Sequence, residues 1–345
     1  MSVIKRRTFL KTASAASIGA LTPIKYLQSK ESINGKILVV LELSGGNDGL
    51  NTIVPFGDDN YYKHRPKIGL KENKLLKIDD YFGFNPGIVG LEALYKEGKM
   101  AIIHGCGYDN PSFSHFTSMA YMHTAAPNSG EEYGWLGRLA DQMAPSTHKN
   151  FIVYVDKTQS LAVKSRTHVP IVFDHPERYQ REGFYAQKNV LNSIINNSDK
   201  NEINASQKFL NEIANSANQS SNLISEAWSK YSRKVDYGID AVDLDKIAAM
   251  IESDLPTKLY YTAFRDNAFD THVHQNNLHT RLLTYASDAI RGFMSDLERM
   301  GKSNDVVLLV MTEFGRRVPE NTSLGTDHGS AGPMFIIGSS VKGGH

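Results

Sequence analysis

The sequence contains one cysteine, Cys106, among 345 residues. A single thiol excludes an intrachain disulfide and a cysteine-rich zinc site. The chain also lacks any apolar run approaching the ~18–20 residues that a membrane-spanning helix needs, so no transmembrane span is expected. Glycine and proline, at 27 and 12 residues, are too few for a collagen-like or low-complexity protein. The fold must therefore be stabilised by side-chain packing, with a metal held by histidine and carboxylate ligands as a further possible contribution.

Neither sign of charge predominates, because 38 lysines and arginines face 37 aspartates and glutamates. This balance creates no strong field for a nucleic acid, and none is expected as a partner. Residues 1–30 contain six of the basic residues and no acidic ones. Without that segment the chain would have 32 basic and 37 acidic residues, a net charge of about −5, which disfavours nucleic acid further.

Residues 1–30 have the layout of an export signal. The basic segment Lys5–Lys11 precedes the weakly apolar stretch Thr12–Ile24. The pair Arg6-Arg7 is typical of a twin-arginine signal, the route that exports folded proteins. We therefore expect the twin-arginine export machinery as a partner, and the periplasm or cell envelope as the location. The alternative is a basic amphipathic start of a cytosolic protein, and the site of signal cleavage stays open.

Short apolar runs alternate with helical patterns along the chain. Several runs are continuous rather than alternating, which favours strands buried on both faces of a largely parallel sheet. The runs are Ile37–Leu43, Met100–Cys106, Phe151–Val155, Leu259–Phe264, Val306–Met311 and Met334–Ile337. Apolar residues at steps of three and four predict helices over 86–98 and 278–300. The sequence therefore predicts a doubly wound α/β fold with helices on both faces of the sheet. Polar residues 185–235, with apolar residues at helical intervals, predict an exposed helical insertion.

Polar clusters follow four of these runs directly. They are Ser44–Asn51, Gly107–His115, Arg265–His274 and Thr312–Arg317. Parallel strands place their carboxyl ends at one edge of a sheet, where open α/β folds build their sites. We therefore expect the four clusters to converge.

Asp48 lies in the first cluster, within a glycine-rich turn. Such a turn lets the backbone approach an ion, and the carboxylate can bind a hard or borderline cation. The alternative is a simple Asn-Asp-Gly turn. Neither a G-x-G-x-x-G nor a Walker pattern is present there, so the segment gives little support to nucleotide binding.

Ser112 and Ser114 lie at the predicted start of a helix. Serine at this position is often only a cap, but the helix dipole and free N–H groups also favour anionic chemistry there. A cation bound to the hydroxyl would lower its pKa, making it a nucleophile without a general base. The chain has no G-x-S-x-G motif, which argues against an α/β-hydrolase triad.

Asp270-Thr271-His272-Val273-His274 is the most ligand-like stretch. In extended backbone Asp270, His272 and His274 would point the same way, whereas in a helix only Asp270 and His274 would. Either geometry joins a carboxylate to an imidazole, a usual pairing for zinc or iron, although a capping aspartate beside surface histidines would look the same.

The last clusters contain Arg316, Arg317 and the segment Asp327-His328. The segment Thr326–Gly329 would ordinarily form a turn, but it follows the Glu313 cluster and can fold back beside it. One of the two arginines could clamp an oxyanion, since the guanidinium is a planar fork of donors, or both could be surface charges. We select Arg316 for the catalytic role.

Six segments occurring in order resemble the bacterial domain-of-unknown-function family 1501, whose members commonly carry twin-arginine signals. They are 43–52 (Leu-Ser-Gly-Gly-Asn-Asp-Gly-Leu-Asn-Thr), 110–116 (Asn-Pro-Ser-Phe-Ser-His-Phe), 134–138 (Gly-Trp-Leu-Gly-Arg), 269–272 (Phe-Asp-Thr-His), 312–317 (Thr-Glu-Phe-Gly-Arg-Arg) and 325–329 (Gly-Thr-Asp-His-Gly). That family is in turn similar to the alkaline phosphatase and sulfatase superfamily. The resemblance implies an alkaline phosphatase-like domain over residues 31–345.

The resemblance also implies roles for individual residues. Ser114, or less readily Ser112, would be the nucleophile. Metal ligands would be Asp48, Asp270 with His272 or His274, Glu313 and His328. The same segments assign Asn51, Ser112, His115 and Asp327 to substrate binding.

Two departures from the superfamily pattern stand out. Phe314 replaces an imidazole, which weakens one of two metal positions and leaves one ion or none there. The family usually continues past Val341–Gly344, so a closing strand and helix are expected to be missing.

These features predict an exported, metal-dependent hydrolase of phosphate or sulfate esters, acting on a small-molecule or glycan ester. Zinc is the expected divalent metal, with calcium, magnesium and manganese as alternatives. The rival hypothesis is a catalytically inactive relative that binds a ligand or an envelope partner, supported by Phe314 and by a plain serine as nucleophile.

Overall fold

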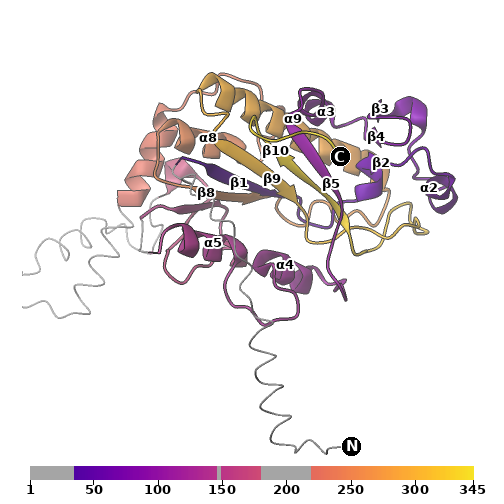
Figure 1. The fold of residues 1–345 in the computed structure, drawn as a ribbon, viewed down its shortest axis with the longest axis horizontal. Coiled ribbons are helices and arrows are strands. Elements are labelled where there is room, and N and C mark those ends of the chain that lie inside the picture. The colour runs from indigo at the N-terminus through magenta and orange to yellow at the C-terminus, as the bar shows by residue number, and fades with distance from the viewer. Residues whose placement is uncertain (1–34, 146–148, 180–218) are drawn as a thin grey trace, which may run out of the picture. The chain divides into compact units, whose positions relative to one another are not determined.

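The centre of the fold is a seven-stranded sheet whose strands run mostly parallel (Figure 1). Across the sheet the order is β5 (Met100–Cys106), β10 (Gly332–Ile337), β9 (Val306–Met311), β1 (Ile37–Glu42), β8 (Leu259–Ala263), β6 (Ile152–Val155) and β7 (Ile171–Phe173). β1 pairs in parallel with β8 and β9, and β6 in parallel with β7 and β8. β10 is antiparallel to both of its neighbours. The predicted α/β architecture with a largely parallel sheet is confirmed.

The computed structural model describes residues 35–145, 149–179 and 219–345. The chain divides into two units, Met1–Gly35 and Lys36–His345, and the description that follows concerns the second. The predicted export signal at 1–30 lies outside the described residues, and so does most of the predicted insertion. Within that insertion, residues 219–230 are helical. In the described ranges, no helix combines the length and apolar character needed to cross a membrane.

All six apolar runs form strands, and most of their side chains are buried on both faces of the sheet, whereas the edge strand β5 exposes residues 103–105. Along β1, Val39 and Leu41 belong to one hydrophobic cluster and Val40 to the other. The first cluster is covered by α3 (Val89–Lys96), α8 (Leu244–Glu252) and α9 (Gln275–Arg299). The opposite face carries α4 (His115–Thr124) and α5 (Trp135–Met143) (Figure 1). Helices thus cover both faces, as the doubly wound pattern predicts.

Smaller elements complete the described part of the chain. β2 (Ile53–Val54), β4 (Gly83–Phe84) and β3 (Leu76–Lys77) form an antiparallel three-stranded sheet, and α2 (Asp59–His64) follows β2. Single-turn 3-10 helices lie at Gly49–Asn51, Glu72–Lys74, Leu161–Val163 and Pro176–Arg178. The sequence analysis missed the small sheet and β7, because strands of two or three residues are too short to produce a recognisable apolar run.

The loops after β1, β5, β8 and β9 leave the sheet at the same edge. β1, β8 and β9 are parallel, and β5 shares their direction because both β5 and β9 are antiparallel to β10. Contacts between the loops follow from this topology, since residues far apart in the sequence are delivered to one edge. The candidate site is built from these four loops and from the segment before β10.

Candidate metal centre

The loop after β1 brings backbone N–H groups to a buried carboxylate. Gly45 and Gly46 have φ angles of +115° and +77°, which residues with a side chain rarely adopt. A Cβ on Gly45 would lie 2.4 Å from the backbone nitrogen of Asp270, so the loops after β1 and β8 touch. The N–H groups of Gly45 and Gly46 donate to Oε1 and Oε2 of Glu313 at 2.9 and 3.0 Å. Glu313 is therefore turned toward the glycine loop.

His115 is the first residue of α4, and Glu313 holds its ring. Nδ1 of His115 lies 2.8 Å from Oε1 of Glu313. Because the ionised carboxylate only accepts, Nδ1 carries the proton and Nε2 keeps its lone pair. Nε2 is buried, has no hydrogen-bond partner among the described residues, and lies 3.4 Å from Oδ2 of Asp270. The hydrogen bond that His115 donates to Glu313 raises the pKa of His115, whereas burial opposes this effect. Carboxylates orient the imidazoles of metal sites in this way.

Asp270 brings two further imidazoles together. Its Oδ1 lies 3.1 Å from Nε2 of His328 and 3.0 Å from Nε2 of His272, and the two Nε2 atoms are 2.9 Å apart. Nδ1 of His328 donates to the backbone oxygen of Phe113 at 2.6 Å, which leaves its Nε2 as an acceptor. Burial alone would raise the pKa of Asp270, but the hydrogen bond and charge of Arg316 outweigh it and lower that pKa.

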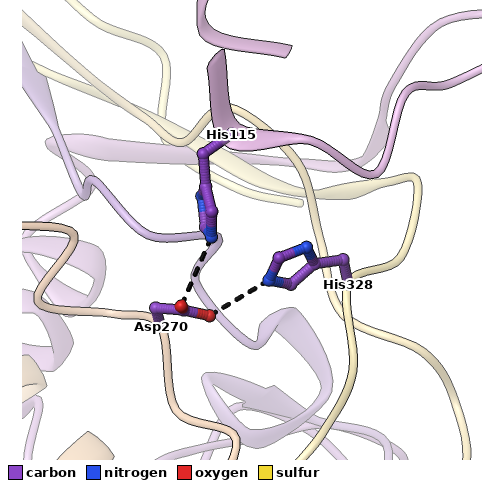
Figure 2. A group of neighbouring side chains, drawn as sticks. All are labelled: His115, Asp270 and His328. Atoms are coloured by element: carbon purple, nitrogen blue, oxygen red, sulfur yellow. Dashed lines mark hydrogen bonds and ion pairs between the residues drawn. The ribbon is translucent and has the colours of Figure 1, made fainter. Parts of the chain in front are cut away.

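His115, Asp270 and His328 direct their ligand atoms toward one point, where these atoms lie within 4.8 Å of one another (Figure 2). Within the described ranges this is the one group of three or more such residues that could hold a metal ion. Ligand atoms bound to one zinc ion at about 2.0–2.2 Å lie roughly 3–3.5 Å apart. The two separations drawn in Figure 2 are 3.4 and 3.1 Å. Imidazoles with a carboxylate suit zinc, and a bound ion would satisfy the orphaned Nε2 of His115. The residues present therefore fit a divalent ion.

Asp48, expected to be the first metal ligand, lies in a buried ion pair instead. Nη1 and Nη2 of Arg65 donate to its Oδ2 and Oδ1 at 2.5 and 3.0 Å, and Gln275 donates to Oδ2. Neither side chain of the ion pair is more than 1% exposed. Burial alone would raise the pKa of Asp48, but the charge and hydrogen bonds of Arg65 lower it. The structure does not bring Asp48 into the group formed by the two histidines and Asp270.

The two adjacent arginines have different surroundings. Arg316 is buried, and its Nη2 donates to Oδ1 of Asp270 at 2.6 Å. Its other donors reach backbone carbonyl groups of the loops after β1, β8 and β9. Arg317 is exposed, and its guanidinium carbon lies 5.8 Å from the centroid of the Phe113 ring. Arg316, predicted to clamp an oxyanion, is therefore placed to hold Asp270, whereas Arg317 faces solvent.

The two predicted nucleophiles precede His115. Ser114 is the N-cap residue of α4, with extended backbone (φ −97°, ψ 127°) and an exposed side chain that makes no capping hydrogen bond. Oγ of Ser112 accepts the backbone N–H of Ser114 at 3.2 Å. The hydroxyl of Ser114 is therefore the freer of the two, one residue from the imidazole of His115.

Phe314 packs against the imidazoles of the group. Its ring centroid lies 4.9 Å from that of His115 and 4.7 Å from that of His328. Its ring also lies over the glycine loop, since a Cβ on Gly46 would come within 2.3 Å of it. Phe314 thus contributes a buried apolar wall beside the imidazoles of His115 and His328.

The remaining predicted residues lie around the group rather than in it. Asn51 is buried, and its Oδ1 accepts hydrogen bonds from Tyr61 and Arg65. His274 is exposed at the start of α9, where its φ of 44° turns the chain. Asp327 is exposed, and its Oδ1 lies 3.4 Å from Nδ1 of His272.

The partners of two residues were not foreseen from the sequence. His115 was assigned to substrate binding, because the carboxylate that orients it is 198 positions away in the sequence. Arg65 was not singled out, because no local motif surrounds it. An isolated buried carboxylate is unfavourable, so a buried Asp48 requires a cationic partner. That requirement was the one signal from which Arg65 could have been sought.

These features define an α/β protein with a histidine and carboxylate group at the carboxyl edge of its sheet. The chain matches the family described as "Protein of unknown function (DUF1501)" over residues 35–345, and it belongs to that family. No curated protein matches the chain.

Solved structures similar to the chain include three bacterial proteins. One is a protein in the alkaline phosphatase superfamily from Vibrio parahaemolyticus (11% identity, TM-score 0.40), and the match covers 89% of this chain and 61% of that one. Another is the C-terminal periplasmic domain of EcEptC from Escherichia coli in complex with Zn (11% identity, TM-score 0.42, 90% and 75% covered). The third is the lipoteichoic acid synthase LtaP from Listeria monocytogenes (10% identity, TM-score 0.39, 90% and 67% covered). The chain thus spans about three fifths of the length of the Vibrio protein.

Proposed function

We propose that this protein is a metal-dependent hydrolase of phosphate or sulfate esters, with Ser114 as its nucleophile. The observation that carries the proposal is the orientation of His115. Glu313 fixes its ring, and the orphaned Nε2 faces Asp270, which also lies beside His328. Three connections of the fold, those after β5, β8 and β9, supply these side chains, so the arrangement exists only in the folded protein.

The proposed ligands are His115, Asp270 and His328, with His272 as a fourth. Zinc is the expected ion, because imidazole nitrogen and carboxylate oxygen are ligands it prefers. A bound divalent ion would stabilise charge on the reacting ester and lower the pKa of the attacking hydroxyl. This set differs from the sequence-based expectation, in which Asp48 and Glu313 were ligands and His115 contacted the substrate.

The protein's own residues would then perform the chemistry. Oγ of Ser114 would lose its proton to solvent and attack the phosphorus or sulfur atom, the bond from that atom to the alcohol oxygen would break, and the departing oxygen would take up a proton from water. Water subsequently hydrolyses the ester formed on Ser114 and releases phosphate or sulfate. Arg317 would bind the anionic group, which is supported by its exposure, whereas the buried Arg316 donates to Asp270 and would position it. Phe113, beside Arg317, offers an apolar surface to the alcohol part of the substrate.

A metal and activity assay on the full chain tests this proposal. Purified protein should contain a divalent metal, and should hydrolyse aryl phosphate or aryl sulfate esters until a chelator removes the ion. Ser114→Ala should abolish turnover and retain the metal, whereas His115→Ala should lose both. Ser229→Ala and His64→Ala, at exposed positions away from the group, are the matched controls. Metal binding without turnover would contradict the hydrolase and favour a ligand-binding relative.

We also propose that residues 1–30 direct the protein to the periplasm or cell envelope through the twin-arginine machinery. The supporting observation is the Arg6-Arg7 pair ahead of a weakly apolar stretch. Cell fractionation of the full chain should find it outside the cytoplasm, and Arg6→Lys with Arg7→Lys should retain it inside. Cytoplasmic retention of the unaltered chain would contradict this proposal.

A further inference from the structure

The ion pair between Asp48 and Arg65 is buried, and the donors of Arg65 all have acceptors. Arg65 has five N–H donors, and all five have acceptors. Two reach the Asp48 carboxylate, one reaches Oδ1 of Asn51, and two reach the backbone oxygens of Arg317 and Val318. The guanidinium is therefore a fixed part of the structure and not a side chain that happens to lie near a carboxylate.

Asp48 is tied to the same loops that carry the proposed ligands. Gln275 donates to its Oδ2, and Oε1 of Gln275 accepts from the hydroxyls of Thr271 and Thr326. Thr271 follows the ligand Asp270, and Thr326 is two residues before the ligand His328. Gln275 thus connects Asp48 to the two segments that carry Asp270 and His328, although the Asp48 carboxylate itself is turned toward Arg65.

Glu313, the other carboxylate expected to bind a second ion, is also fully engaged. Its two oxygens accept hydrogen bonds from Gly45, Gly46, Thr312 and His115. Because these donors occupy both oxygens, Glu313 would influence a bound ion indirectly, by orienting the ring of His115. Asp48 and Glu313 lie outside the proposed ligand group, and both carboxylates are buried and already hydrogen-bonded.

We propose that the site holds one divalent ion, and that the Arg65 guanidinium supplies on Asp48 the positive charge that a second ion would otherwise provide. This inference rests on the metal site of the proposed function. A buried carboxylate needs a compensating cation, and here the chain carries that cation itself. Arginine stays protonated at any physiological pH. A second ion at Asp48 would have to displace it and leave a buried, unpaired guanidinium, which is strongly unfavourable.

The stoichiometry of metal binding tests this inference directly. The full chain is dialysed against zinc, and the bound metal is counted by elemental analysis. Wild-type protein should bind one equivalent, and Asp270→Asn should lose it. Asp48→Asn alone would strand the Arg65 charge and can prevent folding. The double variant Asp48→Asn/Arg65→Met therefore removes both charges together. It should still bind one equivalent, with an affinity within about threefold of wild type, since it leaves every ligand in place.

The possible failures are distinguishable. Two equivalents in the wild-type protein, with one of them lost in Asp48→Asn/Arg65→Met, would overturn the single-ion inference and leave the hydrolase proposal intact. Loss of the one equivalent in the double variant would make Asp48 a ligand and would also overturn the inference. No bound metal in the wild-type protein would overturn the metal centre itself, and this inference with it.

Discussion

Oε1 of Glu313 accepts a hydrogen bond from Nδ1 of His115 over 2.8 Å, and this contact joins the loop after β9 to the start of α4. Its consequence is chemical as well as structural. The proton on Nδ1 leaves the lone pair on Nε2, which is the nitrogen that faces Asp270. In the proposed metal centre, Glu313 would orient this imidazole toward the ion without itself being a ligand.

The first prediction concerns this orientation. Glu313→Gln should lower the affinity for zinc by roughly 10–100-fold, because the neutral amide polarises the His115 ring less and can present an N–H to Nδ1. A competition titration against a chromophoric chelator measures the effect. Glu226→Gln, at an exposed position on the helix 219–230, is the control. Equal affinities of the Glu313 variant and wild type would mean that the pair has no influence on the metal.

The second prediction separates the two arginines. Arg317→Ala should raise KM for an anionic aryl ester about tenfold, which corresponds to about 1.4 kcal/mol, with little change in kcat. The reason is that Arg317 is exposed and free to meet the substrate anion. Arg317→Lys should recover part of the loss, because the charge is kept and the planar fork is not. Steady-state kinetics at low and high salt provide the measurement, and an unchanged KM would exclude the role.

The third prediction concerns a second histidine–carboxylate pair, at the other end of α4. Nε2 of His123 lies 2.8 Å from Oε2 of Glu42, and Tyr261 also donates to that oxygen. Glu42 is buried. From α4, the hydrophobic cluster on this face of the sheet receives only the partly buried Met122, and the contact between His123 and Glu42 is a further attachment of this helix to the sheet. His123→Leu would remove one hydrogen-bond partner of the buried Glu42 carboxylate, and should cost about 1–3 kcal/mol of unfolding free energy.

Urea denaturation measures this loss. The double variant Glu42→Leu/His123→Leu is the informative comparison, because removing both partners avoids the unpaired buried charge and should cost much less than His123→Leu alone. Equal losses in the two variants would show that packing, rather than the pairing, is what His123 contributes.

The fourth prediction concerns pH and a buried histidine outside the metal centre. Burial lowers the pKa of His279 from 6.5 to about 4, with smaller lowering from Arg65 and Arg316 against an opposing effect of Asp48. Nε2 of His279 donates to Oδ1 of Asn47 at 2.8 Å. As the pH falls from 6.5 toward 4, the unfolded chain binds a proton at this residue before the folded protein does. The stability contribution is therefore complete above pH 6.5 and is lost progressively toward pH 4.

The loss approaches about 1.4 kcal/mol per pH unit for this one group. Unfolding free energies at pH 7 and pH 5, in the presence of a chelator, should differ less in His279→Gln than in wild type. His64→Gln, at an exposed position, is the control and should behave like wild type. A pH dependence that is identical in all three proteins would contradict the assignment.

The layers of the fold, and the edge of the sheet at which the polar clusters meet, could be predicted from the chain alone. Runs such as Val306–Met311 are apolar throughout because both of their faces are buried, and that pattern is visible without coordinates. The heptad-like spacing of 278–300 likewise predicted the long helix α9, within a few residues of its observed bounds. The polar clusters after parallel strands then had to meet at one edge.

The direction of each strand and the partner of each polar side chain are visible only in the folded chain. β10 has the same apolar character as the parallel strands, so composition could not reveal that it is antiparallel. Nothing in the sequence around Asp48 shows that Arg65 donates to both of its carboxylate oxygens. Nothing around His115 shows that Glu313 accepts a hydrogen bond from its ring. Apolar burial leaves a periodic record in the chain because it acts on whole segments. The charge and orientation of one side chain depend on a few atoms from segments that are distant in the sequence. The local sequence around that residue therefore does not predict them.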